Sequence, residues 1–232
     1  MRFAFVHLPR TGGTTITRQL VQNGTVLQID GRDGVRNFLL RNPDERCSFD
    51  FAAGHMPFGI ERYIPGLPVV IFLRHPLERI LSSYRQARSN PEHPNHQDFR
   101  KMTFAEYLRS DLFRRDDPMV RFLSKRDWSE ALNDGPIWWQ RLPLGRQSTR
   151  LLDEAKENLK RCAFIGFTET FQQSATTLFE MFGLTGAQTW PKENSNPESP
   201  QLIDLAPDTL TLLKRRHELD VELYEFARSL RP

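Results

Sequence analysis

The chain has 232 residues, of which 38% are hydrophobic and 26% charged, a composition that fits a soluble globular enzyme and excludes collagen-like, fully disordered and membrane-spanning chains. Its net charge of +3 suits an anionic ligand, and its aromatic residues are scattered, so we expect no nucleic-acid partner. Cys47 and Cys162 match neither a metal site nor a disulfide framework, and the short apolar start lacks a signal-peptide cleavage site. We therefore expect a cytoplasmic protein without a transmembrane segment or a catalytic metal.

Three segments repeat one pattern, in which a short apolar strand leads through a turn into a helix. The predicted strand and helix pairs are 3–8 with 14–23, 68–74 with 75–88, and 163–167 with 168–183. This alternation predicts parallel strands covered by helices on both faces. The expected fold class is α/β, a three-layer sandwich like that of P-loop NTPases, with one domain over residues 1–232.

Residues 89–150 separate the second and third pairs and form a polar, basic insertion of the kind that often binds a substrate. Within this region we predict an exposed loop over 88–101 and an amphipathic helix over 103–113. The last segment, 207–230, has apolar residues around a charged face and predicts one closing helix.

Gly12 and Gly13 lie between the first strand and the first helix, beside Arg10 and the hydroxyls of Thr14 and Thr15. Glycines at a helix start expose backbone N–H groups that bind anions, and Arg10 adds a positive charge. The alternative is an ordinary tight turn. A kinase-type P-loop requires a Lys after the second glycine, and this chain has none there.

Three further polar residues are predicted to belong to the same site. Arg74 ends the second strand, and Ser82 lies eight residues later on the following helix. Carboxyl ends of parallel strands share one edge, so Arg74 can face the glycine turn, although each residue is alone compatible with a solvated surface role. His55 follows Gly54 at another predicted strand end. Imidazole titrates near neutral pH and suits proton acceptance, whereas the alternative is a structural histidine in a turn.

The opening segment "HLPRTGGTT" resembles the 5′-phosphosulfate loop of sulfotransferases that use 3′-phosphoadenosine 5′-phosphosulfate (PAPS), in particular the heparan-sulfate 2-O- and 6-O-sulfotransferases and their bacterial relatives. "IFLRHPLERILSSYRQ" resembles that family's 3′-phosphate segment, "GHMPFG" its G-H-x-x-[YF]-G pattern, and "FIGFTETFQQSATTLFEMFG" its later strand and helix. The likeness covers residues 1–88 and 162–230 and is weak across the insertion.

The resemblance implies transfer of a sulfuryl group from PAPS to an acceptor hydroxyl, on a carbohydrate, with adenosine 3′,5′-bisphosphate as the product. It implies His55 as the catalytic base and Arg10, which stands where the family usually has Lys, as a catalytic charge stabiliser. The implied cofactor contacts are Arg10, Thr11, Gly12, Gly13, Thr14, Thr15, Arg74, Ser82, Asn194 and Ser195.

Several alternatives stay open at this point. Spacing alone favours a flexible connector around Asn194 and Ser195. Trp128, Trp138 and Trp139 are stacking surfaces for sugar rings or buried core residues. A small alcohol, a lipid or a peptide tyrosine stays open as the acceptor. A nucleotide-dependent, kinase-like phosphotransferase and a non-catalytic nucleotide-binding protein remain as alternative functions.

Overall fold

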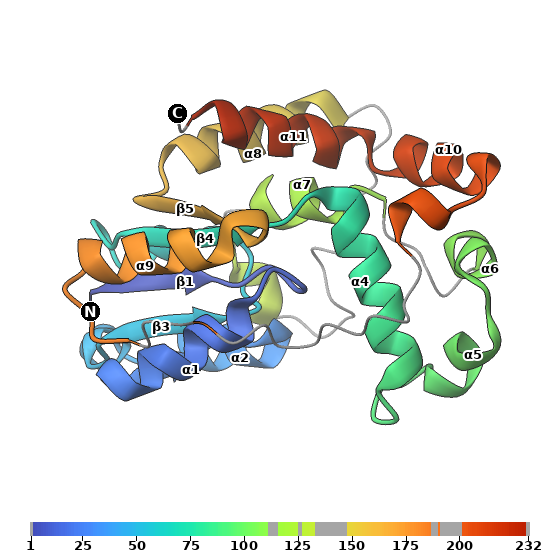
Figure 1. Ribbon diagram of the computed structural model, residues 1–232. Helices are drawn as coiled ribbons and strands as arrows, with labels where there is room; N and C mark the ends of the chain where they lie inside the picture. The colour runs from blue at the N-terminus through green and yellow to red at the C-terminus, as the bar shows by residue number, and fades with distance from the viewer. Residues whose placement is uncertain are drawn as a thin grey trace.

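A computed structural model describes residues 2–110, 116–124, 127–132, 148–186, 190 and 201–230. Five strands form one parallel sheet in the order β2-β3-β1-β4-β5. Figure 1 shows four of them, β3, β1, β4 and β5, side by side. The strands are β1 Phe3–Val6, β2 Val26–Gln28, β3 Phe51–Gly54, β4 Val69–Leu73 and β5 Phe164–Phe167. The α-helices are α1 Gly13–Asn23, α2 Gly31–Leu40, α3 Pro43–Cys47, α4 Pro76–Ser89, α5 His96–Lys101, α6 Phe104–Arg109, α7 Pro118–Ser124, α8 Ser148–Lys160, α9 Phe171–Met181, α10 Pro207–Arg216 and α11 Glu218–Ser229.

Alternation of side chains along the strands builds two cores, one on each face of the sheet. Phe3 and Phe5 of β1 pack with α1 and α9, whereas Ala4 and Val6 pack with α2, α7, α8 and α11. The helices in Figure 1 accordingly form a layer on either side of the strands. This three-layer arrangement confirms the predicted α/β sandwich.

A third apolar cluster lies beside the sheet, where α4 packs with α5, α6 and α10 (Figure 1). The predicted exposed loop over 88–101 is wrong in its second half, because His96–Lys101 forms α5 and buries Phe99 in this cluster. The predicted helix over 103–113 begins after Thr103, whose side chain makes a capping box with Glu106.

The C-terminal segment contains two helices, so the prediction of one closing helix is also wrong. The break falls at His217, whose backbone angles (φ −130, ψ 27) end α10 and begin α11. The two helices differ in their main neighbours, since α10 packs on α6 whereas α11 packs mainly on α7 and α8 and also contacts α4. No helix among the residues described is long and apolar enough to cross a membrane.

Because all five strands are parallel, their carboxyl ends lie along one edge of the sheet. This edge carries His7 after β1, Asp30 shortly after β2, His55 after β3, Arg74 after β4 and Thr168 after β5. The candidate site is built from these residues and from the first turns of the helices that follow them.

Candidate active site

The turn between β1 and α1 is packed so tightly that only glycine fits at two positions. Gly12 has a left-handed φ of 83°, and a Cβ there would lie 2.6 Å from the ring of Phe171. A Cβ on Gly13 would lie 2.0 Å from the ring of His7. Arg10 also has a positive φ, 71°, a conformation that non-glycine residues adopt only at an energetic cost.

The start of α1 has the features of an anion site. The first turn contains no acidic residue, and its N-cap residue, Gly12, has no side chain with which to cap the N–H groups. Uncapped N–H groups at a helix start carry a partial positive charge and bind anions. Thr14 is exposed there, Thr15 is buried, and the buried Thr11 hydroxyl donates to the carbonyl oxygen of Leu8 at 2.8 Å. Thr11 therefore has only its backbone N–H left to donate to a ligand.

Side chains tie this turn to the loops after β4 and β5. Arg10 Nε donates to Ser82 Oγ of α4 at 3.1 Å. Thr168 Oγ1 lies 3.1 Å from the carbonyl oxygen of Thr11 and 3.0 Å from that of Leu73. Segments far apart in the sequence are thus held together at one edge of the sheet, and the structure brings Arg10 and Ser82 into direct contact.

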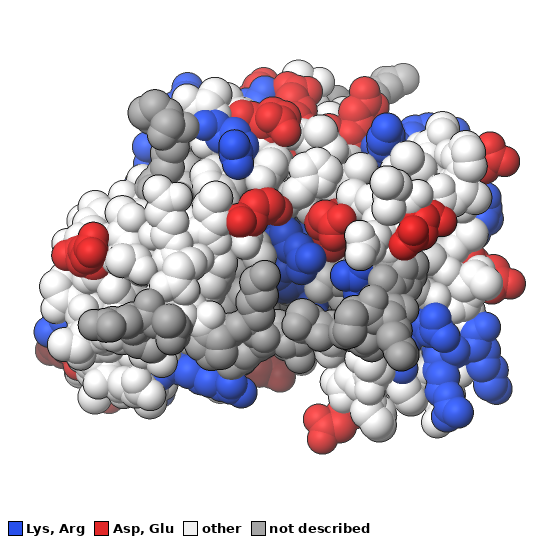
Figure 2. Space-filling model, in the orientation of Figure 1, with Lys and Arg blue, Asp and Glu red and all other residues white. Residues whose placement is uncertain are grey.

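Positive charge accumulates at this edge. Burial, and next the charge of Arg74, lower the pKa of Arg10. Burial also lowers the pKa of Arg74, while Glu78 and Glu169 act in the opposite direction, and Glu78 Oε2 lies 3.7 Å from Arg74 Nη2. Figure 2 shows basic atoms in a hollow at the middle of this face, bordered by acidic groups. Two guanidinium groups that repel each other in a partly buried hollow favour an anionic ligand.

His55 follows β3, and its ring is held by an aspartate that sequence analysis missed. His55 Nδ1 lies 3.2 Å from Asp30 Oδ1, and the backbone N–H of His55 donates to the same oxygen at 2.8 Å. The side chain of His55 remains 43% exposed, so it is accessible to a substrate. Gly54, with φ 148°, permits this approach because a Cβ there would lie 2.3 Å from the carbonyl oxygen of Ile29.

A second imidazole lies against His55. The ring of His7 is buried and stacks on that of His55, with the centroids 4.3 Å apart. Burial is the largest cause that lowers the pKa of His7, to about 3, and the charges of His55 and Arg10 act in the same direction while Asp30 opposes them. His7 is therefore neutral at physiological pH. It fills the space between Gly13 and His55 and places the exposed imidazole next to the glycine turn.

The structure does not describe four further residues that the sequence singled out, and it places a fifth in the core. Asn194 and Ser195 lie outside the described residues, as do Trp138 and Trp139. Trp128 is not a stacking surface for sugars, because it is fully buried in the core, with its ring centroid 5.5 Å from that of Phe38.

Asp117, His217 and Asp220 form a buried group with ligand atoms within 4.8 Å of one another. The oxygens of Asp220 accept backbone N–H groups at the start of α7, and Asp117 accepts the N–H of Asp220 at the start of α11. Arg79 Nη2 lies 3.9 Å from Asp220 and opposes a cation there. The two aspartates thus act as reciprocal caps that join α7 to α11.

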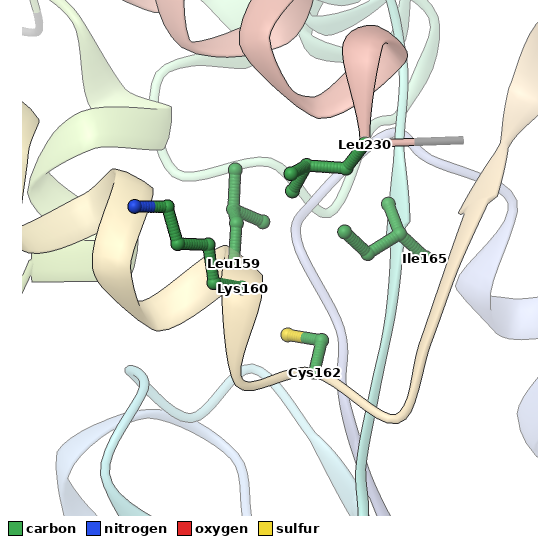
Figure 3. A pocket seen from close by; sticks show the side chains of 5 residues that line it. All are labelled: Leu159, Lys160, Cys162, Ile165 and Leu230. Carbon is green, nitrogen blue, oxygen red and sulfur yellow. The ribbon is translucent and has the colours of Figure 1, made fainter. Parts of the chain in front are cut away.

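A groove lies at the other end of the sheet, at the amino end of β5 (Figure 3). It is lined by Leu159, Lys160, Cys162, Ile165 and Leu230. Cys162 precedes β5, so this groove is at the edge opposite to the strand ends that carry Arg10, Arg74 and His55. It lacks the guanidinium groups and the helix start that make up the candidate active site.

Comparison with known proteins identifies the class of this chain. A sequence profile described as the sulfotransferase family matches residues 2–227, so the chain belongs to the sulfotransferase family, and the resemblance seen in its sequence is confirmed.

The individual relatives share only a modest sequence identity with this chain. The chain is 26% identical over 271 residues to heparan-sulfate 6-O-sulfotransferase 1-B of Danio rerio, covering 97% of this chain and 65% of that protein. It is 25% identical over 272 residues to heparan-sulfate 6-O-sulfotransferase 1 of Homo sapiens, covering 97% of this chain and 64% of that protein. The chain therefore spans less than two thirds of the length of these relatives. A crystal structure of a sulfotransferase from Alicyclobacillus acidocaldarius aligns over 95% of each chain with 14% identity and a TM-score of 0.46, which carries no structural conclusion.

Proposed function

We propose that this chain transfers a sulfuryl group from PAPS to a hydroxyl group of a carbohydrate and releases adenosine 3′,5′-bisphosphate. The observation that carries the proposal is the contact between Arg10 and Ser82 at the uncapped start of α1, with Arg74 beside it. Membership of the sulfotransferase family supports the reaction type. The names of the relatives, heparan-sulfate 6-O-sulfotransferases, support a carbohydrate acceptor.

The residues at the edge of the sheet fit a nucleotide with phosphate groups at both ends. In the proposal, the N–H groups of Gly12, Gly13 and the first turn of α1 bind the 5′-phosphosulfate together with Arg10. Arg74 and Ser82 bind the 3′-phosphate, for which a guanidinium offers paired donors. PAPS supplies the sulfuryl group and, in the bisphosphate, a stable leaving group.

His55 and Arg10 have separate tasks in the proposed reaction. His55 accepts the proton of the acceptor hydroxyl as its oxygen forms a bond to sulfur. The bond between sulfur and the phosphate oxygen breaks, and Arg10 with the amides of the turn stabilises the negative charge that develops on that oxygen. Arg10 remains charged throughout, so it serves as an electrostatic group and not as a proton donor.

The acceptor is proposed to bind the insertion at 89–150 of a single sulfotransferase domain. Exposed basic side chains on α4 and α5, namely Arg88, Arg100 and Lys101, support an acceptor that carries negative charge. Of the expected sugar-stacking residues, Trp128 is excluded by its burial.

The test is an acceptor screen with PAPS and a panel of glycans that includes desulfated heparan sulfate, read by the mass gain of the product. We expect sulfated product from the wild type and from Glu180→Ala, a control at an exposed position in the last turn of α9, away from the proposed site. We expect His55→Ala to give no product but to bind adenosine 3′,5′-bisphosphate with unchanged affinity in calorimetry. Loss of binding in His55→Ala would contradict its assignment as the base. Transfer from ATP that a metal chelator abolishes would instead indicate a phosphotransferase, and binding without any transfer would indicate a non-catalytic protein.

A further inference from the structure

We propose that Asp30 is the positioning residue of the reaction: it fixes the ring of His55 so that Nε2 is the nitrogen that accepts the proton. This inference rests on the proposed role of His55. Asp30 lies in the β2–α2 connection, outside the sequence motifs by which the chain resembles its family, and it was not predicted from the sequence.

Both oxygens of Asp30 are engaged. Oδ1 is 3.2 Å from His55 Nδ1 and 2.8 Å from the backbone nitrogen of His55, and Oδ2 accepts from Gln28 Nε2 at 2.7 Å. The side-chain hydrogen bond to His55 is the largest cause that holds the pKa of Asp30 well below its usual range. Asp30 is therefore ionised, and it acts only as an acceptor.

The contact between Asp30 and His55 is unusual for a residue at the position that Asp30 occupies. Asp30 is the N-cap residue of α2, where an aspartate ordinarily accepts N–H groups of its own helix. Among the described residues, however, its side chain makes no capping hydrogen bond to α2. Its carboxylate is directed at His55 instead, at the expense of the stabilisation that a cap provides.

The backbone keeps the two residues in register. Ile29 donates its N–H to the carbonyl oxygen of Ala53, and Gly31 donates to that of His55 at 3.2 Å. The pairing of β2 with β3 thus continues beyond both strands, as far as the edge of the sheet that carries the candidate active site. Asp30 is fixed relative to His55 by this ladder as well as by its side chain.

An ionised oxygen beside Nδ1 determines the tautomer of the ring. Nδ1 must carry the hydrogen that it donates to Asp30, so the lone pair is on Nε2. When the acceptor hydroxyl gives its proton to Nε2, the resulting imidazolium lies next to a carboxylate that stays ionised. His7, neutral and stacked 4.3 Å away, adds no competing charge and limits rotation of the ring.

The experiment compares Asp30→Ala with a matched control, Asp50→Ala. Asp50 is a partly exposed aspartate that also holds a neighbouring segment, through the backbone N–H of Thr25 at 2.8 Å, but it lies at the opposite end of β3. Nitrogen-15 NMR of histidine-labelled protein reports the tautomer of His55, and its resonance is assigned by its absence in His55→Ala. Turnover is measured with PAPS and desulfated heparan sulfate.

In the wild type and in Asp50→Ala we expect the Nδ1–H tautomer and equal turnover. In Asp30→Ala we expect a shift towards the Nε2–H tautomer and a fall in kcat of about 10²-fold, the lower range of general-base catalysis, with the KM for PAPS unchanged. Because Asp30 acts through His55, adding Asp30→Ala to His55→Ala should cause no further loss.

Asp30→Ala with an unchanged tautomer and a kcat within threefold of the wild type would overturn the proposal. A further loss on the His55→Ala background would also overturn it, because Asp30 would then act on something other than His55. A tautomer shift in a protein that transfers no sulfate to any acceptor would support the pairing of Asp30 with His55 and overturn the proposed function instead.

Discussion

Gly13→Ala tests whether the packing of the glycine turn against His7 determines the position of His55. The new Cβ would lie 2.0 Å, 2.2 Å and 2.4 Å from three atoms of the His7 ring, whereas ordinary contacts begin at 3.4 Å. The ring must therefore move by at least about 1 Å to restore normal contact distances. His7 stacks directly on His55, so this movement displaces the proposed base.

A displacement of about 1 Å at a reacting group can lower the rate by about 10²-fold, which corresponds to roughly 2.7 kcal/mol in the activation free energy. The free energy of unfolding should fall by less. Overpacking costs about 1–3 kcal/mol, and the higher helix propensity of Ala returns about 1 kcal/mol. We therefore expect a folded protein with low kcat, measured by transfer of labelled sulfate from PAPS, and with nearly unchanged nucleotide affinity in calorimetry.

Gly183→Ala is the matched control. Gly183 has φ +61° and no described atom within 4 Å of its would-be Cβ, so the substitution strains the backbone without touching another side chain. We expect a stability loss of about 1 kcal/mol from the left-handed conformation and normal turnover. If Gly13→Ala turned over as fast as this control, the proposed coupling between the turn and His55 would be refuted.

Three further substitutions probe separate parts of the molecule. Thr168→Val removes the hydroxyl near the carbonyl oxygens of Thr11 and Leu73, so it should lower the unfolding free energy by about 1–2 kcal/mol and weaken nucleotide binding. An unchanged nucleotide affinity would show that the Thr168 hydroxyl does not hold the site together. Burial raises the pKa of Asp117 to about 7, so the carboxyl group of Asp117 binds a proton more tightly in the folded than in the unfolded state. The stability that this protonation contributes is therefore lost as pH rises from about 4 to about 7. The unfolding free energy of Asp117→Asn relative to the wild type should rise by roughly 2–4 kcal/mol across that range, and a pH-independent difference in urea unfolding would contradict this assignment. Trp128→Phe should keep full turnover in the sulfate-transfer assay, because Trp128 is a core residue, whereas selective loss of glycan affinity would restore its role in sugar stacking.

Much of the candidate active site was predictable from the sequence because its residues lie in or next to segments with strong local patterns. Apolar runs located β1, β4 and β5, and a parallel sheet then places the residues after these strands at one edge. On that basis Arg10, Arg74 and Ser82 were expected to converge, and the structure places them together. Their roles in binding PAPS remain proposals.

The missed features depend on contacts between segments that carry no local pattern. Asp30 follows a strand of three residues, too short for a recognisable period, and its pairing with His55 exists only once β2 lies beside β3. Similarly, α10 and α11 share one amphipathic pattern, and their separation at His217 arises from packing on different partners. The burial of Trp128 beside Phe38 likewise depends on tertiary contacts between distant residues.

In the proposed function, two turns at one edge of the sheet bind a nucleotide at both of its phosphates, and calorimetry with two ligands tests this binding. The wild type should bind adenosine 3′,5′-bisphosphate more tightly than adenosine 5′-monophosphate. A charge-assisted hydrogen bond contributes about 1.5–3 kcal/mol, so Arg74→Ala should weaken binding of the bisphosphate by about 10- to 150-fold and leave binding of the monophosphate nearly unchanged. Equal weakening of both ligands, or no preference for the bisphosphate in the wild type, would show that Arg74 does not bind the 3′-phosphate.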